Sequence, residues 1–396
     1  MAQDRGMAAP VALARPRFAA LDLVRVAMMV LGIPFHVAIA YRAFYSPGVF
    51  FDPHGAWWWH FLIGMVRVFR MPTFFFLAGF FTAMLVANRG VGGMAMNRLA
   101  RVGLVWILAL AALSPIVYWV GAINHSAGEG GGARDKTWAA IRTGSVEASW
   151  FAAPPLHLWF LEYLLLFCLA GAAVSWASAH IPAIAAVAER AAGRILVSRM
   201  RVPVLSIPYI GLLWTTLPGG LAYPSEFVPR LDVFLGYGFF FFAGWLLYRR
   251  RDLLPEVLAL RWSEIALAVL ALAVNTFCFK LWSDFGVDSP AWSHGGRAVT
   301  TAVGAWAILF ALLGLATKAV PKPSARLQYF ADSCYWSYLM HFPLALLLPA
   351  LLSGWTAHSL VKVPSITALI LALMLLSYHL FVRRTFIGRL LHGPRQ

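Results

Sequence analysis

The first long apolar run of the sequence contains an arginine and a histidine that could take part in chemistry. Arg25 and His36 are eleven residues apart, so on an α-helix they point in nearly the same direction, about 16 Å apart along the axis. Asp22 precedes Arg25 by three residues, a spacing at which the two can pair. Charged groups inside a membrane span cost roughly 3 kcal/mol each and usually mark a functional site. This face therefore predicts an anion-binding group near one end and a titratable base nearer the other, unless Arg25 only reaches lipid headgroups and His36 only bonds a neighbouring helix.

The second apolar run contains Arg67 and Arg70, one turn apart, before the sequence MPTFFFLAGFF. Two buried arginines require a carboxylate, a phosphate or an internal acid. Structural pairing with Glu162 or Asp232 is the alternative to substrate binding. Glu162, in the sequence HLWFLEYLLLF, lies at a depth near that of His36. It could support His36 as a general base, or it could pair with an arginine.

Two further pairs of polar residues lie near the expected ends of apolar runs. The sequence YFADSCYWSYLMHFP contains Asp332 near one end and His341 deeper in the run. His341 is predicted either to bind an acceptor, to support His36, or to be an ordinary core histidine. Arg98 and Arg101 precede the third run, where they could bind phosphates or serve only as topology signals.

The composition predicts a protein whose surface is covered mainly by lipid. The chain is 61% hydrophobic and 12% charged, with a mean hydropathy of +0.73, whereas soluble domains contain about 25% charged residues. Its net charge is +16, but the basic residues lie mostly in short segments between apolar runs. This distribution favours membrane topology and anionic headgroups as the cause, and it argues against nucleic acid as a partner.

Ten apolar runs are long enough to cross a membrane, which needs roughly 20 residues of helix. Lysines and arginines are concentrated in alternate segments, as expected if both ends of the chain are cytoplasmic. The sequence therefore predicts an all-α, polytopic transmembrane bundle over residues 18–382, with cytoplasmic tails at 1–17 and 383–396. The predicted runs are 18–41, 57–87, 102–123, 156–178, 203–220, 232–248, 262–281, 298–317, 329–352 and 364–382.

Several features outside the runs refine this prediction. Segment 179–202 is rich in alanine with spaced arginines and is predicted to form an amphipathic helix on the membrane surface. Trp57, Trp58 and Trp59 are typical of an interfacial belt, with a sugar-stacking platform as the weaker alternative. The cysteines show no metal-type spacing, so no metal site and no permanently bound cofactor are expected. A homo-oligomer is compatible with the sequence.

These residues and motifs resemble the acyltransferase 3 family of bacterial membrane acyltransferases over nearly the whole chain. The sequence LDLVRVAMMVLGIPFH is similar to the family's first-helix signature, in which a histidine follows an arginine after ten residues. The sequences MPTFFFLAGFF, HLWFLEYLLLF and YFADSCYWSYLMHFPL resemble three later blocks in the same order. The late block and the tryptophan-rich middle block most resemble succinyltransferases of osmoregulated periplasmic glucans.

The resemblance implies an enzyme of the bacterial inner membrane that uses cytoplasmic acyl-CoA, here succinyl-CoA, to modify a periplasmic glucan or another envelope polysaccharide. Arg25 and His36 would be the family's essential pair. The nucleotide phosphates of the donor would lie near Arg25, Arg98 and Arg101. Its pantetheine arm would then follow the first helix toward His36, because that arm can cover the 16 Å or so between the two side chains.

His36, helped by Glu162, is expected to deprotonate a sugar hydroxyl, which then attacks the thioester. An acyl-histidine intermediate is the other route. Arg67 or Arg70 would hold a succinyl carboxylate or stabilise the oxyanion. The competing function is a transporter of an anion or a sugar, which also explains buried arginines; the absence of an internal repeat weakens it.

Overall fold

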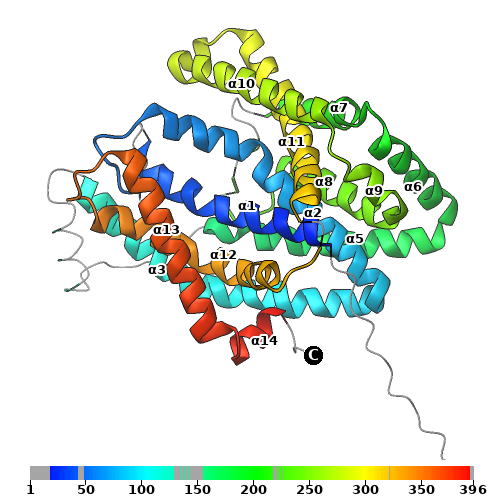
Figure 1. Ribbon diagram of the computed structural model, residues 1–396, viewed down its shortest axis with the longest axis horizontal. Coiled ribbons are helices and arrows are strands. Elements are labelled where there is room, and N and C mark those ends of the chain that lie inside the picture. Colours follow the sequence, from blue (N-terminus) through cyan, green and yellow to red (C-terminus); the bar gives the residue numbers. More distant parts are fainter. Residues whose placement is uncertain are drawn as a thin grey trace, which may run out of the picture.

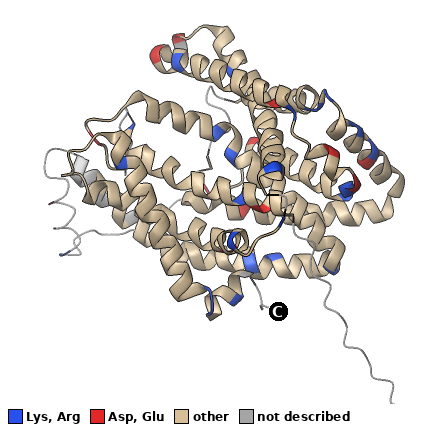
Figure 2. Ribbon diagram, in the orientation of Figure 1, with Lys and Arg blue, Asp and Glu red and all other residues tan. Residues whose placement is uncertain are grey.

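The computed structural model describes residues 18–42, 49–128, 155–216, 221, 223–224, 226–320 and 322–392, with isolated positions at 135, 139 and 142. Within this part of the chain, helices form the structure and no strand occurs, so the predicted all-α fold is confirmed. Most of the ribbon carries neither basic nor acidic residues (Figure 2). The predicted tail at 1–17 and most of the predicted loop at 124–155 lie outside the described residues.

The helices pack along one another as an irregular bundle in which α1 lies near the centre (Figure 1). In chain order they are α1 (Ala19–Ala38), η1 (Ile39–Tyr41), α2 (Trp57–Arg98), η2 (Leu99–Gly103), α3 (Leu104–Gly128), η3 (Leu156–Leu158), α5 (Trp159–His180), α6 (Pro182–Val197), α7 (Arg201–Trp214), α8 (Leu231–Arg249), η4 (Arg251–Leu253), α9 (Leu254–Val257), α10 (Trp262–Phe285), η5 (Gly286–Asp288), α11 (Ala291–Ala319), α12 (Ala325–Leu351), α13 (Ser359–Ser377), η6 (Tyr378–Val382) and α14 (Phe386–His392).

Each predicted apolar run coincides largely with helix, although α7 ends at Trp214, before the end of the predicted run 203–220, whose last four residues lie outside the described part of the chain. The number of candidate spans differs from the ten predicted. Among the described residues, eight stretches are long and apolar enough to cross a membrane, or nine if α6 and α7 form one span. One stretch, Trp57–Gly121, is 65 residues long, or about 100 Å at 1.5 Å per residue, against a bilayer core of about 30 Å. It breaks at Gly90, whose φ of 69° is left-handed. It therefore contains two of the predicted runs.

Helix α6 is largely exposed, as expected for the amphipathic helix that the sequence predicts in segment 179–202. Of its residues, α6 buries only Gly193 and Leu196, and its arginine Arg190 is exposed. A bend of 116° separates α6 from α7. The C-terminal segment departs from the prediction of a simple tail, because α14 packs against η2 and η6 and buries Leu391.

The core of the bundle depends on a close approach of α2 and α8. A Cβ atom at Gly79 would overlap the carbonyl of Phe241, and one at Gly244 would overlap the carbonyl of Phe76. Small residues allow two membrane helices to approach at backbone distance, which replaces the missing hydrophobic driving force by van der Waals contact. Around this crossing, rings of α2, α8 and α11 pack together in a buried aromatic cluster: Phe76, Phe240, Trp306 and Phe310.

A buried ion pair fixes α7 against α10. Arg201 is fully buried and donates from Nε and Nη2 to the two carboxylate oxygens of Glu264, at 2.5 and 2.8 Å. Its Nη1 donates to the carbonyls of Leu196 and Val257, and its guanidinium lies over the Phe310 ring. From the sequence, Arg201 is only one of the spaced arginines of segment 179–202. The structure shows that it also holds two helices together.

Helix ends that the sequence predicts on the same side of the membrane lie close together in the structure. The start of α1, the end of α2 and the start of α12 surround one cavity. The end of η1, the start of α2, the end of α10 and the start of α11 meet elsewhere, through Arg42, His60, Phe279 and Arg297. This grouping agrees with the alternating directions that the loop charges predict. Which side is cytoplasmic stays a prediction, and both sides are named below as the sequence predicts them.

Candidate active site

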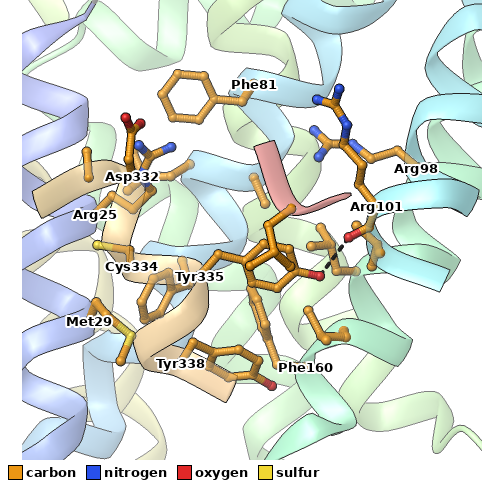
Figure 3. Close-up of a pocket in the computed structure, with 18 of the residues that line it drawn as sticks. Arg25, Met29, Phe81, Arg98, Arg101, Phe160, Asp332, Cys334, Tyr335 and Tyr338 are labelled. Carbon is orange, nitrogen blue, oxygen red and sulfur yellow. Dashed lines mark hydrogen bonds between the residues drawn. The ribbon is translucent and has the colours of Figure 1, made fainter. Parts of the chain in front are cut away.

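A cavity of about 420 Å³ lies between α1, α2, η2, α5 and α12. Figure 3 shows Arg25 and Asp332 on one side of it, Arg98 and Arg101 on the other, and Phe81 between them. Tyr335, Tyr338 and Phe160 lie further in (Figure 3). The other residues used below that line it are Met29, Arg70, Phe74 and Cys334. One end of the cavity is therefore strongly basic, and the other is aromatic.

The predicted pair on α1 forms at the basic end. Arg25 Nη2 lies 2.9 Å from a carboxylate oxygen of Asp22, one turn earlier, and the guanidinium lies 5.6 Å from the centroid of the Phe81 ring. Its Nε is buried and has no hydrogen-bond partner among the described residues. Asp22 thus orients the Arg25 side chain while Arg25 still lines the cavity.

A local distortion of the backbone brings Arg98 and Arg101 to the same cavity. Residues Leu99–Gly103 form the π-helical segment η2, and such segments are frequent at functional sites. Arg98 Nη2 donates to Thr82 Oγ1 at 3.2 Å, and the Tyr335 hydroxyl donates to the carbonyl of Arg101 at 2.7 Å (Figure 3). The first bond holds Arg98 against an earlier part of α2, and the second ties η2 to α12, so both arginines are held in place.

Arg70 of α2 lies at the inner end of the cavity and is 7% exposed. Its Nε donates to the carbonyl of Met28 at 3.1 Å, and its guanidinium carbon lies 5.6 Å from the Phe35 ring centroid and 5.8 Å from that of Phe74. Gly32 makes room for it, because a Cβ there would overlap the guanidinium. No hydrogen bond within the described chain occupies its two terminal nitrogens.

Three histidines meet beside Arg70. The ring centroid of His341 lies 5.3 Å from that of His36 and 5.7 Å from that of His157, and the Phe342 ring contacts both His36 and His157. The positive charge of Arg70 acts on all three rings. His157 belongs to η3, directly before α5, and the sequence analysis did not single it out. It begins the block HLWFLEYLLLF, and its position at the outer end of that run could have placed it at the depth of His36.

Hydrogen bonds to backbone carbonyls determine which ring nitrogen carries the hydrogen in His341 and in His157. His341 Nδ1 lies 2.9 Å from the carbonyl oxygens of Ser337 and Tyr338, and His157 Nε2 lies 3.2 Å from that of Leu339. A carbonyl oxygen only accepts, so each of these nitrogens carries a hydrogen. In the neutral rings, His341 Nε2 and His157 Nδ1 then keep a lone pair, and both atoms are buried without a hydrogen-bond partner in the described structure. The cluster thus contains two proton acceptors beside His36.

Comparison with known proteins agrees with a site of this kind. A family model described as an acyltransferase domain matches residues 18–379. The chain belongs to the acyltransferase 3 family. It is similar to proteins named glucans biosynthesis protein C from Salmonella paratyphi A, Salmonella agona and Salmonella dublin, with 23% identity over 399 residues that cover 96% of this chain and 95% of each relative. No solved structure matches the chain.

The protein is therefore a multi-pass membrane acyltransferase, and the resemblance found in the sequence is confirmed. The structure brings together most of the residues that the sequence proposed for this site. Arg25, Arg98 and Arg101 share the basic end of the cavity, Arg70 lines its inner end, and His36 contacts His341. Asp332, which the sequence places near one end of its apolar run, also lines the cavity.

Two residues that the sequence analysis proposed for the site, Glu162 and Arg67, do not take part in the contacts described above. Glu162 is buried in the first turn of α5, and no hydrogen bond or ion pair between described residues involves it, with either His36 or an arginine. The rings around His36 are Phe35, His341 and Phe342. Arg67 points away from the cavity and lies 4.5 Å from the Tyr223 ring. The structure thus separates Arg67 from Arg70, which the sequence treated as equivalent.

Proposed function

We propose that this membrane acyltransferase moves an acyl group from acyl-CoA, bound at the cytoplasmic side, to a hydroxyl of a carbohydrate on the periplasmic side of the inner membrane. The single observation that carries the proposal is the cavity itself, which has three arginines at its cytoplasmic end and leads to Arg70 at the end beside the histidines. The name of the relatives supports a glucan as the acceptor.

Arg25, Arg98 and Arg101 suit the phosphates of a coenzyme A donor. Guanidinium groups bind phosphate through charge-assisted, often bidentate hydrogen bonds. Each of the three lines the cavity, and the ion pair of Arg25 with Asp22 holds one of them in place there. The pantetheine arm would extend from them past Met29 and Tyr338, which line the same cavity, and would bring the thioester to the histidines.

The chemistry that follows is a direct acyl transfer. His36 takes the proton of the attacking sugar hydroxyl, the hydroxyl oxygen bonds to the thioester carbonyl carbon, and the carbon–sulfur bond breaks. The proton on His36 then passes to the leaving sulfur, so the products are the acyl ester and free CoA. His341 would assist by accepting a hydrogen bond at Nε2 from the protonated His36 ring, because its Nδ1–H is bonded to the carbonyls of Ser337 and Tyr338.

Arg70 supplies positive charge where negative charge develops. Its terminal N–H groups have no hydrogen-bond partner among the described residues, and Phe35, Phe74 and Met28 hold the guanidinium in place. They can donate to the oxyanion that forms on the thioester carbonyl. They can equally bind the terminal carboxylate of a succinyl group, which makes succinyl-CoA our proposed donor. Glu162 stays a candidate for an accessory role, with a smaller expected effect than His36.

The donor site can be tested by titrating succinyl-CoA against purified protein in the presence of a glucan and measuring free CoA. We expect the variant Arg98→Ala with Arg101→Ala to raise the KM for succinyl-CoA by tenfold or more, because two phosphate contacts are lost. The catalytic rate at saturating donor should change less, since the histidines and Arg70 are untouched. Arg190→Ala is the matched control, because it removes an exposed arginine of the same side from α6.

Two results would contradict the proposal. An unchanged KM in the double variant would remove Arg98 and Arg101 from the donor site. Wild-type protein that releases no CoA from any acyl-CoA with a glucan present, but carries an anion across liposomes without acyl-CoA, would favour the transporter that the buried arginines alone would also permit.

A further inference from the structure

A second group of basic side chains lies on the periplasmic side, away from the donor cavity. It comprises Arg42 after η1, Arg67 in α2 and Arg297 in α11, together with His60 at the start of α2. The charge of Arg67 acts on both Arg42 and Arg297, and all three arginines act on His60. Three helices, η1, α2 and α11, therefore bring these basic groups to one place.

No carboxylate neutralises these three arginines within the described part of the chain. Other arginines of the protein do have partners of this kind, as Arg201 has Glu264 and Arg230 has Asp232. Arg297 is 8% exposed, and both its Nε and its Nη1 are buried without a hydrogen-bond partner. Unpaired buried charges of one sign are costly, so the group is expected to be completed by an anion from outside the chain.

Aromatic rings surround the same cations. The Arg297 guanidinium lies 4.6 Å from the Phe279 ring centroid and 5.7 Å from that of Trp282, and His60 stacks on Phe279 at 4.8 Å. Cation–π contacts stabilise a guanidinium but leave its N–H groups free to donate. Flat rings beside such donors also suit the apolar face of a sugar.

A chain of ring contacts joins this group to the catalytic histidine. Arg67 lies over the ring of Tyr223, whose centroid is 6.4 Å from that of Phe35. Phe35 in turn contacts His36, at 5.0 Å between ring centroids. Arg67, which does not line the donor cavity, is therefore connected to His36 through two intervening rings, so an acceptor anchored at Arg67 could extend to His36.

We propose that Arg42, Arg67 and Arg297 bind a carboxylate or phosphate group carried by the acceptor, so that the enzyme prefers an acidic carbohydrate to a neutral one. This inference rests on the proposed function, because it assigns a site to the acceptor of that reaction. The same chemistry would also suit the headgroup of an anionic lipid. The acceptor is favoured because Tyr223 and Phe35 connect the group to His36.

The test uses a neutral β-glucan oligosaccharide and the same oligosaccharide carboxymethylated at a low level, with succinyl-CoA as donor. For wild-type protein we expect a kcat/KM at least tenfold higher for the acidic form. The variant Arg67→Gln with Arg297→Gln should lower this preference tenfold or more, because it removes two positive charges and keeps polar side chains that can still donate hydrogen bonds. Arg230→Gln is the matched control, since Arg230 is a periplasmic-side arginine already paired with Asp232.

The outcomes separate this inference from the proposed function. If wild-type protein acylates neither oligosaccharide, the proposed function itself fails. If both are acylated equally well and the double variant leaves that ratio unchanged, the acidic-acceptor site is wrong. The same assay is repeated in vesicles of neutral lipid with and without an anionic lipid; a double variant that keeps the acidic preference but loses its response to the anionic lipid would overturn the acceptor assignment in favour of a headgroup. Should the double variant unfold, Arg42→Gln, a change at a half-buried position, is expected to lower the same preference.

Discussion

Replacing His36 by alanine is expected to lower acyl transfer at least a hundredfold, with succinyl-CoA binding largely kept. General acid–base catalysis by a positioned side chain contributes roughly 10²- to 10⁴-fold, and His36 lies beside the thioester end proposed for the donor. The donor arginines Arg25, Arg98 and Arg101 are unchanged by the substitution. Steady-state release of free CoA, with donor affinity measured separately by isothermal titration, checks both halves of this expectation.

His180→Ala provides the control for this experiment. His180 is also a histidine of a membrane-spanning helix, but it is exposed at the end of α5 and bonds only within its own helix turn. Its loss should leave acyl transfer within about twofold of wild type, as surface substitutions usually do. Full activity in His36→Ala would show that His341 or His157 is the base and that His36 only fills space.

Replacing Arg201 by alanine is expected to destabilise the protein by about 3 to 5 kcal/mol, because it leaves the carboxylate of Glu264 buried without a partner. The two carbonyls that Arg201 Nη1 bonds, those of Leu196 and Val257, would also lose their donor. The effect is on folding and not on chemistry, since the pair lies outside the donor cavity. Thermal unfolding of the purified protein in detergent measures it.

Two companion variants make this result specific. Arg199→Ala removes an exposed arginine two residues earlier and should leave the unfolding temperature nearly unchanged. Arg201→Leu combined with Glu264→Leu should recover much of the stability, because replacing both charges by apolar groups avoids the unpaired carboxylate. An Arg201→Ala variant as stable as Arg199→Ala would mean that the pair contributes little to the fold.

The sequence predicted the class of fold and half of the site because both follow from local patterns. Apolar runs show where helices form, and the spacing of Arg25 and His36 on one helix fixes their common face. Asp22 pairs with Arg25 for the same reason, since three residues are nearly one turn. The position of Arg98 and Arg101 before the third run led to the hypothesis that they bind phosphates, although only the structure shows that they share a cavity with Arg25.

What the sequence could not show depends on contacts between distant helices. Whether Glu162 or His341 supports His36 depends on how α5 and α12 pack, and depth in the membrane alone cannot distinguish them. Arg67 and Arg70 lie three residues apart, but the rotation of α2 turns Arg70 into the cavity and Arg67 toward Tyr223. By contrast, the end of the predicted run 57–87 agrees with the break at Gly90, whose φ of 69° a glycine adopts without strain, so this feature was visible in the sequence.

The most direct test of the central claim is a transfer assay across a membrane. Purified protein is reconstituted in liposomes that enclose a glucan, and succinyl-CoA labelled in its acyl group is supplied outside only. We predict that label appears on the enclosed glucan with release of free CoA outside, and that liposomes with His36→Ala show neither. Label that reaches the glucan only when both substrates are on the same side, or not at all, would contradict a donor-to-acceptor path from the arginine cavity through the histidines.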